Sequence, residues 1–409
     1  MPNEKLIGRL APAKANALRA LVLALASLAL FIPRLSVPGA YIYDELPYIS
    51  SARALLGGTA DTNPEHPPLG KVLIAASIKL FGDHPFGWRF ASVLAGVGIV
   101  VGMFYLGLRL LGNPSLAMLA AVLTLLNHFT FVMARVAMLE VFILMFAVTG
   151  VAAWMAAVRG WYPRTMLAWA GVMLGCSISV KWSSIAVLGV VGAITLALWV
   201  RKRLLVGIGF AAFSLCFLPL VTYYLSFWPL LRSQHAALSV AEVVRRSQFI
   251  WHFHQHAFGN RGLNSPWYQW VFRTEPERAL NYLVGNWAVC WLGIAALLYC
   301  VICLCRKPAL EETVVVALFA GSWLQWALIP RPFEYYYYYS LAATFLCLAV
   351  PTALRRAPGY RVFGVRLSLI NVVAVALLFV VFYPKMTALE APWDCAIVCI
   401  SCVMRVSPI

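Results

Sequence analysis

The sequence has few charged residues. Only 11% of its 409 positions are Asp, Glu, Lys or Arg, whereas 62% are hydrophobic. Soluble globular proteins contain about 25% charged and 45–50% apolar residues. A single core of this length cannot enclose so much apolar surface, so the composition excludes an ordinary soluble fold and indicates that lipid surrounds much of the chain. The sequence therefore predicts an all-α polytopic membrane protein.

Several functional signatures are also missing. The chain has no Gly-rich nucleotide loop, no Ser-His-Asp order and no basic, aromatic pattern typical of RNA binding. We therefore expect no nucleic-acid partner, and we interpret the formal charge of +17 as a sign of membrane topology. No internal repeat of spans is visible, which disfavours the many secondary transporters built from inverted repeats. The ten cysteines are scattered, mostly in apolar runs, and are interpreted as buried thiols.

Apolar segments of about 20 residues recur along the chain, and we expect about eleven membrane-spanning helices. They are placed near 17–33, 86–110, 114–132, 137–157, 165–180, 184–200, 204–227, 283–305, 313–329, 335–353 and 367–384. With a cytoplasmic N-terminus, the alternate short loops that carry most of the Arg and Lys fall inside, as the positive-inside rule predicts, and the short turn at Arg331 falls outside. Two long loops, 34–85 and 228–282, then lie outside and are expected to contain interfacial helices. Residues 1–390 form one domain, followed by an external tail at 391–409.

The first external loop carries most of the chemistry. Asp44 and Glu45 directly follow the first span, where a carboxylate near apolar surface acquires the raised pKa that suits a general base. A solvated loop pair is the alternative. Glu65 and His66 precede two prolines and Lys71, a pattern that predicts a helix starting near Pro67 or Pro68. The helix N-terminus and Lys71 would offer positive potential to an anion, although a structural proline turn also fits.

Three further cations are predicted to reach the same face. Arg135, Lys181 and Arg331 each lie at the external end of a span, as phosphate ligands or as interfacial anchors. Glu140 lies one turn into an apolar helix, and an ionisable residue inside a span is a candidate functional group. The tyrosine run at 335–339 is interpreted mainly as an interfacial aromatic belt.

The second external loop offers a weaker site. His252, His254 and His256 could bind a metal if Glu65 completed the set, but the same stretch supplies no carboxylate. We therefore expect no required cofactor, with a divalent metal at Glu65 and His256 as the alternative. Trp267 and Tyr268 suit acceptor binding by stacking, or an interfacial amphipathic helix.

These motifs together resemble the protein O-mannosyltransferase family. The resemblance runs from about residue 17 to 390. It rests on Tyr43-Asp44-Glu45, His66-Pro67-Pro68-Leu69-Gly70-Lys71, Ala134-Arg135-Val136-Ala137-Met138-Leu139-Glu140, Val180-Lys181-Trp182, Ser265-Pro266-Trp267-Tyr268-Gln269-Trp270 and Arg331-Pro332-Phe333-Glu334-Tyr335-Tyr336. The family implies a GT-C bundle of about eleven spans, a catalytic carboxylate at Asp44 with Glu45 beside it, and a lipid-phosphate contact at Arg135. Glu140 stands where the family often has Asp, and tyrosines stand where it often has a His. The second loop is too short for the β-trefoil of eukaryotic members, so the chain resembles a prokaryotic one.

The resemblance implies an inverting glycosyl transfer from a polyprenyl-phosphate sugar, expected to be mannose, to a hydroxyl of protein Ser or Thr. Lys71, Arg135, Lys181 and Arg331, with His66, would face the donor. Glu65, Glu140, His256, Trp267 and Tyr268 would serve the acceptor or a secondary site. We expect the protein in the bacterial inner membrane, with its site on the periplasmic side. The alternatives are transfer to lipid A or another envelope glycolipid, as in aminoarabinose transferases, and transport of an anionic lipid.

Overall fold

The computed structural model describes residues 3–256, 265–277, 282–329, 334–357, 361–362 and 365–388. In these residues the chain is almost entirely helical. The first half contains α1 (Asn3–Phe31), α2 (Glu45–Gly57), α3 (Leu69–Phe81), α4 (Pro85–Leu111), α5 (Pro114–Leu125), α6 (His128–Met133), α7 (Leu139–Val158), α8 (Pro163–Val180) and α9 (Ile185–Val200). The second half contains α10 (Ile208–Ala212), α11 (Leu218–Ser226), α12 (Trp228–Ser233), α13 (Val240–His256), α14 (Gly293–Arg306), α15 (Leu310–Leu328), α16 (Ser340–Leu346), α17 (Ala349–Arg356) and α18 (Leu367–Met386).

Short 3₁₀ and π turns extend several of these helices. The 3₁₀ turns are Trp182–Ser184, Trp267–Phe272 and Tyr336–Tyr339, and the π turns are Phe213–Phe217 and Ala288–Leu292. Strands β1 (Arg361–Val362) and β2 (Val365–Arg366) form a two-residue antiparallel hairpin, which the all-α prediction did not include.

Each of the eleven expected spans coincides with helix in the part of the chain that the structure describes. Eight of these helical segments are long and apolar enough to cross a membrane, judged by length and composition. The other three expected spans, 114–132, 165–180 and 313–329, correspond to α5 with α6, to α8 and to α15. The break between α5 and α6 occurs because Leu126 ends one helix and the Asn127 side chain caps the next by accepting from the Phe129 amide.

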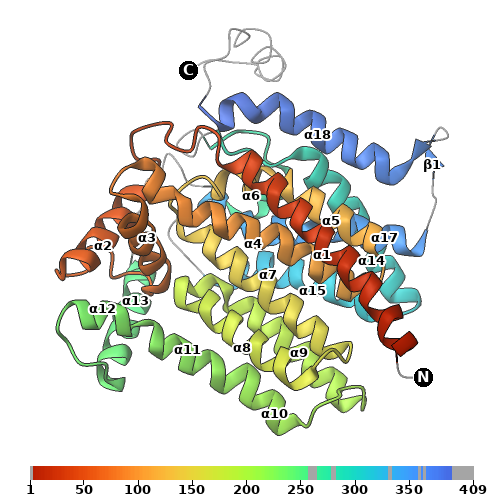
Figure 1. The fold of residues 1–409 in the computed structure, drawn as a ribbon, viewed down its shortest axis with the longest axis horizontal. Helices are drawn as coiled ribbons and strands as arrows, with labels where there is room; N and C mark the ends of the chain where they lie inside the picture. The colour runs from red at the N-terminus through yellow and green to blue at the C-terminus, as the bar shows by residue number, and fades with distance from the viewer. Residues whose placement is uncertain are drawn as a thin grey trace.

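The long helices run in a similar direction, and the expected external loops meet at one end (Figure 1). There α2 and α3 from the first loop lie beside α12 and α13 from the second, and α2 packs against α12. The N-terminus and the β1–β2 hairpin lie at the opposite end (Figure 1). The topology predicted from basic loops therefore places both long loops together, as the fold does.

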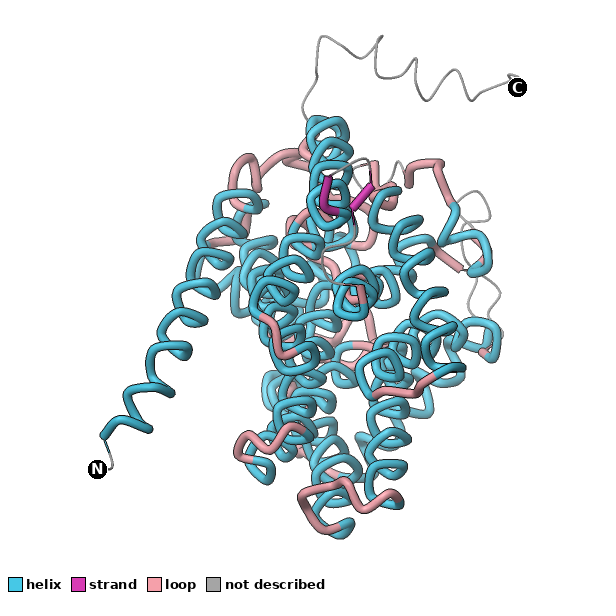
Figure 2. Tube along the Cα trace, turned by 90° about the vertical axis from the view of Figure 1, so that its right-hand side faces the viewer, coloured by secondary structure: helices cyan, strands magenta, loops and turns pink. Residues whose placement is uncertain are grey.

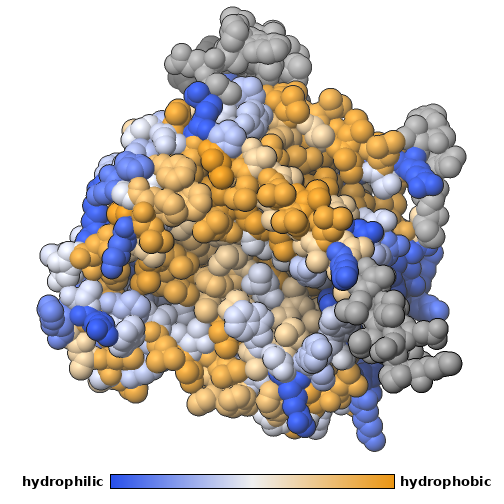
Figure 3. Space-filling view, in the orientation of Figure 1, coloured by the Kyte–Doolittle hydropathy of each residue, from blue (hydrophilic) through white to orange (hydrophobic). Residues whose placement is uncertain are grey.

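Helix α7 lies at the centre, packed against α4 and α8, whereas α1 and α18 are peripheral. Figure 2 shows α1 diverging from the other helices toward its N-terminus. Its Leu18, Leu21 and Leu25 side chains are exposed. Figure 3 shows hydrophobic surface across the flank and hydrophilic residues gathered toward the two ends, the distribution expected of a bundle surrounded by lipid.

At the end near the N-terminus, two carboxylates of α15 tie three helices together. Glu311 pairs with Arg159 at 2.6 Å and with Arg355 at 3.0 Å, and Glu312 pairs with Arg356 at 2.7 Å. Three arginines of the predicted cytoplasmic loops, Arg159, Arg355 and Arg356, thus link α7 and α17 to α15.

The tyrosine run was interpreted wrongly as an interfacial belt. Tyr336, Tyr337 and Tyr339 are at most 2% exposed, and the run forms a 3₁₀ turn that enters the core before α16. Their rings pack on other aromatic side chains: Phe129 contacts Tyr336 and Tyr339, and Trp270 also contacts Tyr339. The burial of Tyr337 brings its hydroxyl to the carboxylate of Asp44 in the first loop.

Candidate active site

Asp44 lies at the N-terminus of α2, partly buried between the two loops and the bundle. It occupies the N-cap position, but its carboxylate makes no capping hydrogen bond. Instead, Tyr337 Oη donates to Asp44 Oδ2 at 2.9 Å. The preceding residue, Tyr43, has a φ of 46°, a left-handed conformation that is costly for a bulky side chain and that concentrates at functional sites. The backbone strain therefore falls beside the residue that the sequence singled out.

The environment of Asp44 makes it a stronger base than an ordinary aspartate. Burial, followed by the nearby charge of Glu140, raises the pKa of Asp44 to about 6, against the opposing effects of the Tyr337 hydrogen bond and Lys181. At neutral pH the carboxylate is still mostly ionised, and it accepts a proton more readily than a solvated aspartate does. Such a group suits proton abstraction from a hydroxyl.

Glu45 has a different environment from its neighbour. Its side chain is fully buried, and Arg89 of α4 holds both carboxylate oxygens at 2.8 Å. The same oxygens accept from the backbone amides of Ile42 and Ala137 at 2.8 Å. These four hydrogen bonds join the first loop to α4 and to the loop before α7, so the geometry gives Glu45 a positioning role beside Asp44.

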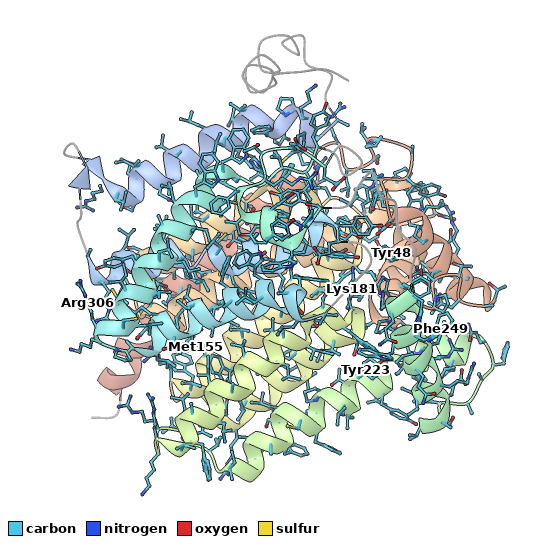
Figure 4. All side chains as sticks on the ribbon, turned by 180° about the vertical axis from the view of Figure 1, so that it is seen from behind. Tyr48, Met155, Lys181, Tyr223, Phe249 and Arg306 are labelled. Atoms are coloured by element: carbon cyan, nitrogen blue, oxygen red, sulfur yellow. The ribbon has the colours of Figure 1, made fainter. Side chains whose placement is uncertain are left out.

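Lys181 and Glu140 form a buried ion pair. Lys181 Nζ lies 2.6 Å from Glu140 Oε1, and both side chains are at most 5% exposed. The ammonium also lies 4.6 Å from the centre of the Tyr338 ring and 5.5 Å from that of Tyr337. In Figure 4, Lys181 lies toward the end of the bundle that carries Tyr48, away from Arg306 at the other end. The ion pair therefore borders the Asp44 site, although Glu140 already shares the lysine's charge.

Lys71 is engaged in holding its own loop. It pairs with Asp61 at 2.7 Å, both side chains being at most 4% exposed, and donates to the backbone carbonyls of Asn63 and His66. Helix α3 begins at Leu69 after Pro68, close to the predicted start. Asn63 also donates to the Glu65 carboxylate, and burial raises the pKa of Glu65. The stretch is thus a rigid turn rather than a solvated one.

His66 connects the two external loops. Its ring lies 5.2 Å from the ring of His254 on α13 and 6.0 Å from that of Tyr48 on α2. His256, by contrast, is exposed and packs on His252 at 4.3 Å. Within the described ranges, no group of three or more His, Cys, Asp or Glu side chains could hold a metal ion.

Arg135 is directed toward the end of α1. Its Nη1 donates to the carbonyls of Phe31 and Pro33, and the side chain is buried. These contacts fix the entry to the first loop, and a phosphate contact at Arg135 stays a prediction. Arg331 lies outside the described residues.

Trp267 and Tyr268 lie in a 3₁₀ turn near the tyrosine run. The Trp267 amide donates to Glu334 at 2.6 Å, and its carbonyl accepts from Trp323 Nε1 at 3.0 Å. Tyr268 is 58% exposed, so its ring is available to a ligand. That Trp267 and Tyr268 bind the acceptor stays a prediction.

The sequence did not reveal several residues that complete the site. Tyr337 was hidden in a run of identical residues, and its partner Asp44 lies 293 positions away. Arg89 was placed inside a span, where its charge could have signalled a buried carboxylate partner. Arg273, whose guanidinium lies 4.9 Å from the centre of the Tyr336 ring, adds a cation near the tyrosine run.

Comparisons with known proteins identify the same family. The family model described as dolichyl-phosphate-mannose-protein mannosyltransferase matches residues 81–233. The polyprenol-phosphate-mannose–protein mannosyltransferase of Mycolicibacterium smegmatis (strain MKD8) is 26% identical over 484 aligned positions, covering 95% of this chain and 93% of that protein. The Mycobacterium tuberculosis protein of the same name (strain H37Rv) is also 26% identical, over 86% of this chain and 84% of that one.

Solved structures agree on the fold. The S. cerevisiae protein O-mannosyltransferase Pmt1–Pmt2 complex bound to the sugar donor has a TM-score of 0.80 at 14% identity, covering 95% of this chain and 92% of that one. ArnT from Cupriavidus metallidurans bound to undecaprenyl phosphate has a TM-score of 0.60 at 15% identity, covering 90% and 73%. With eight apolar helices of spanning length in its described residues, the protein is an integral membrane protein. The chain is therefore similar in sequence to the protein O-mannosyltransferases over most of its length, and it has their GT-C fold.

Proposed function

We propose that this protein transfers mannose from a polyprenyl-phosphate carrier to a Ser or Thr hydroxyl of a protein, with inversion, at the periplasmic face of a bacterial inner membrane. The acceptor oxygen forms a bond to the anomeric carbon while the bond from that carbon to the phosphate oxygen breaks. The hydroxyl proton passes to Asp44, and the lipid phosphate leaves. Because the lipid tail stays in the bilayer, the reaction needs no nucleotide site, and we propose that it needs no resident metal.

The observation that carries this proposal is the position of Asp44. Its carboxylate has a pKa raised to about 6, is held by Tyr337, and lies beside the Lys181–Glu140 pair where the external loops meet the bundle. A general base contributes typically about 10²–10⁴ in rate. Fixed positive charge near a leaving phosphate acts strongly in a partly dry site, because the phosphate gains charge in the transition state. Lys181 and Arg273 bring positive charge to the tyrosine run, 4.6 Å from the centre of the Tyr338 ring and 4.9 Å from that of the Tyr336 ring.

The curated relatives bear the name of protein mannosyltransferases, which favours a protein acceptor. The likeness to ArnT shows a common fold, and an envelope glycolipid is therefore the alternative acceptor to test.

The proposed function is tested with purified protein in neutral-lipid nanodiscs, polyprenyl-phosphate mannose and a Ser/Thr peptide. We expect mannosylated peptide, detected by mass spectrometry, with transfer unaffected by EDTA. Transfer to a glycolipid extract but not to the peptide would favour the aminoarabinose-transferase type of acceptor. No product in nanodiscs, together with donor movement across the membrane of proteoliposomes, would favour a transporter.

Replacing Tyr337 with Phe should move the pH profile. The Tyr337 hydrogen bond favours the ionised carboxylate and so lowers the pKa of Asp44, and its loss should raise that pKa further above 6. Since the base must be ionised, the acidic limb of kcat/KM should shift to higher pH. Tyr268→Phe, at an exposed tyrosine, is the matched control and should leave the limb in place. An unmoved limb in Tyr337→Phe would contradict the role given to this hydrogen bond.

A further inference from the structure

An open groove lies between the two external loops, at the far end of α2 from Asp44. Its volume is about 660 Å³, within the range of ligand sites. One wall is the exposed chain that follows α2, from Gly58 to Ala60, and the other is formed by Gln234 and by Arg245, Arg246 and Phe249 of α13. The Phe249 side chain lies at the outer part of this end in Figure 4.

Hydrogen bonds hold the two walls of the groove together. Gln234 Nε2 donates to the Thr59 carbonyl at 3.2 Å, and Arg246 donates to Gln234 Oε1 at 3.1 Å, so the two walls are joined through one amide. Below the groove, Asp61 is held by Ser51 and by Lys71. The floor is thus fixed to the same helix whose N-terminus carries Asp44.

The groove has excess positive charge. Arg245 and Arg246 share one carboxylate, Glu242, at 2.7 Å each. The charge of Asp61 is matched by Lys71 at 2.7 Å. One positive charge is therefore left over, and the Arg245 side chain is 71% exposed. Phe249, 47% exposed and stacked on Phe253, adds apolar surface beside the arginines. The complementary ligand carries a carboxylate and an apolar group on an extended backbone.

Helix α2 sets the distance between this groove and the site of transfer. Asp44 occupies the N-cap position and Gly58 the C-cap position, and 13 helical residues span about 20 Å. An extended polypeptide covers about 3.3–3.6 Å per residue, so about six residues bridge the two points.

We propose that this groove binds the acceptor polypeptide, and that it selects acidic residues about six positions from the modified Ser or Thr. The inference rests on the proposed function, because it concerns the acceptor of that reaction. It assigns Arg245 and Arg246 a part in acceptor affinity rather than in the chemical step, so that their effect falls on KM and not on kcat.

Two peptides test the proposal, both with one central Ser. One carries Asp at positions five to seven on either side of the Ser, and the other carries Asn there. In neutral-lipid nanodiscs we expect KM for the Asp peptide to be about fivefold lower at unchanged kcat, the size expected of one or two partly exposed ion pairs. The double variant Arg245→Gln/Arg246→Gln should bring the KM ratio near one. Arg232→Gln, at an exposed arginine of the same loop that does not line the groove, should keep the ratio.

Fluorescence anisotropy of the same peptides, labelled with fluorescein, measures their binding in the absence of the sugar donor. It separates the proposed function from the proposal that the groove binds the acceptor. Charge-dependent binding without any transfer would overturn the proposed function and support the groove. Equal KM and equal binding for both peptides in the wild type, or a preference that survives the double variant, would overturn the groove. An effect of the double variant that requires anionic lipid in the nanodisc, whatever the peptide charge, would assign the groove to lipid headgroups and also overturn it.

Discussion

Asp44→Asn should lower kcat/KM for mannosyl transfer by about 10²–10⁴ at neutral pH, the range for loss of a general base. Asn keeps the shape of the side chain and an oxygen that can accept from Tyr337, but it cannot take the acceptor's proton. In the wild type, activity should rise with pH as Asp44 ionises, with a midpoint near its pKa of about 6. Rates measured with purified protein from pH 5 to 8 check both the loss and the midpoint.

Two measurements separate this loss from misfolding. The raised pKa means that the fold favours protonated Asp44, so its stabilising effect is present below the ordinary pKa of 3.8 and is lost as pH rises through about 6. Asp44→Asn should therefore keep or raise Tm at neutral pH, and donor binding should persist. Asp83→Asn, at an exposed aspartate of the same loop, should retain transfer. Transfer by Asp44→Asn near the wild-type rate would exclude Asp44 as the base.

Arg89→Leu should destabilise the protein by about 3–5 kcal/mol, the usual cost of leaving a buried charge without its partner. Arg89 and Glu45 are both fully buried, and the guanidinium also donates to the carbonyls of Leu35, Pro38 and Ala40 at 2.9–3.0 Å. Its loss leaves the Glu45 carboxylate with two backbone amides only and releases the first loop. The change is measured as a fall in the midpoint of thermal unfolding in detergent.

A second bidentate pair provides the comparison. Arg53 holds Asp83 at 2.8 and 2.9 Å, but their side chains are 37% and 45% exposed. Exposed ion pairs contribute about 0–1 kcal/mol, so Arg53→Leu should cost far less than Arg89→Leu. Similar losses in the two variants would mean that burial does not determine the contribution of the Arg89–Glu45 pair.

The parts of this fold that depend on local composition could be predicted from the sequence. Helix existence follows from apolar run length, and the grouping of loops 34–85 and 228–282 follows from the distribution of Arg and Lys. Asp44 could be singled out because it belongs to a cluster of carboxylates between two long apolar segments. In each case the signal lies in the kinds of residue along the chain and needs no knowledge of contacts between distant segments.

The rest depends on contacts between distant segments. Adjacent carboxylates, Asp44 and Glu45, have opposite surroundings because only Glu45 meets Arg89, and no local pattern distinguishes them. Lys71 resembles an anion ligand until its pairing with Asp61 is seen. The tyrosine run reads as a belt because its composition is interfacial, whereas packing against Phe129 and Trp270 places most of it inside.

The span of 293 residues between Asp44 and Tyr337 has a consequence for biogenesis. Glu45 needs Ala137 and Arg89 before the first loop is fixed, and Asp44 receives its hydrogen bond only after residue 337 has left the ribosome. A nascent chain halted after α13 would hold the carboxylate without its tyrosine. The pH dependence that this hydrogen bond sets should therefore be established late in membrane insertion, once Tyr337 has reached Asp44.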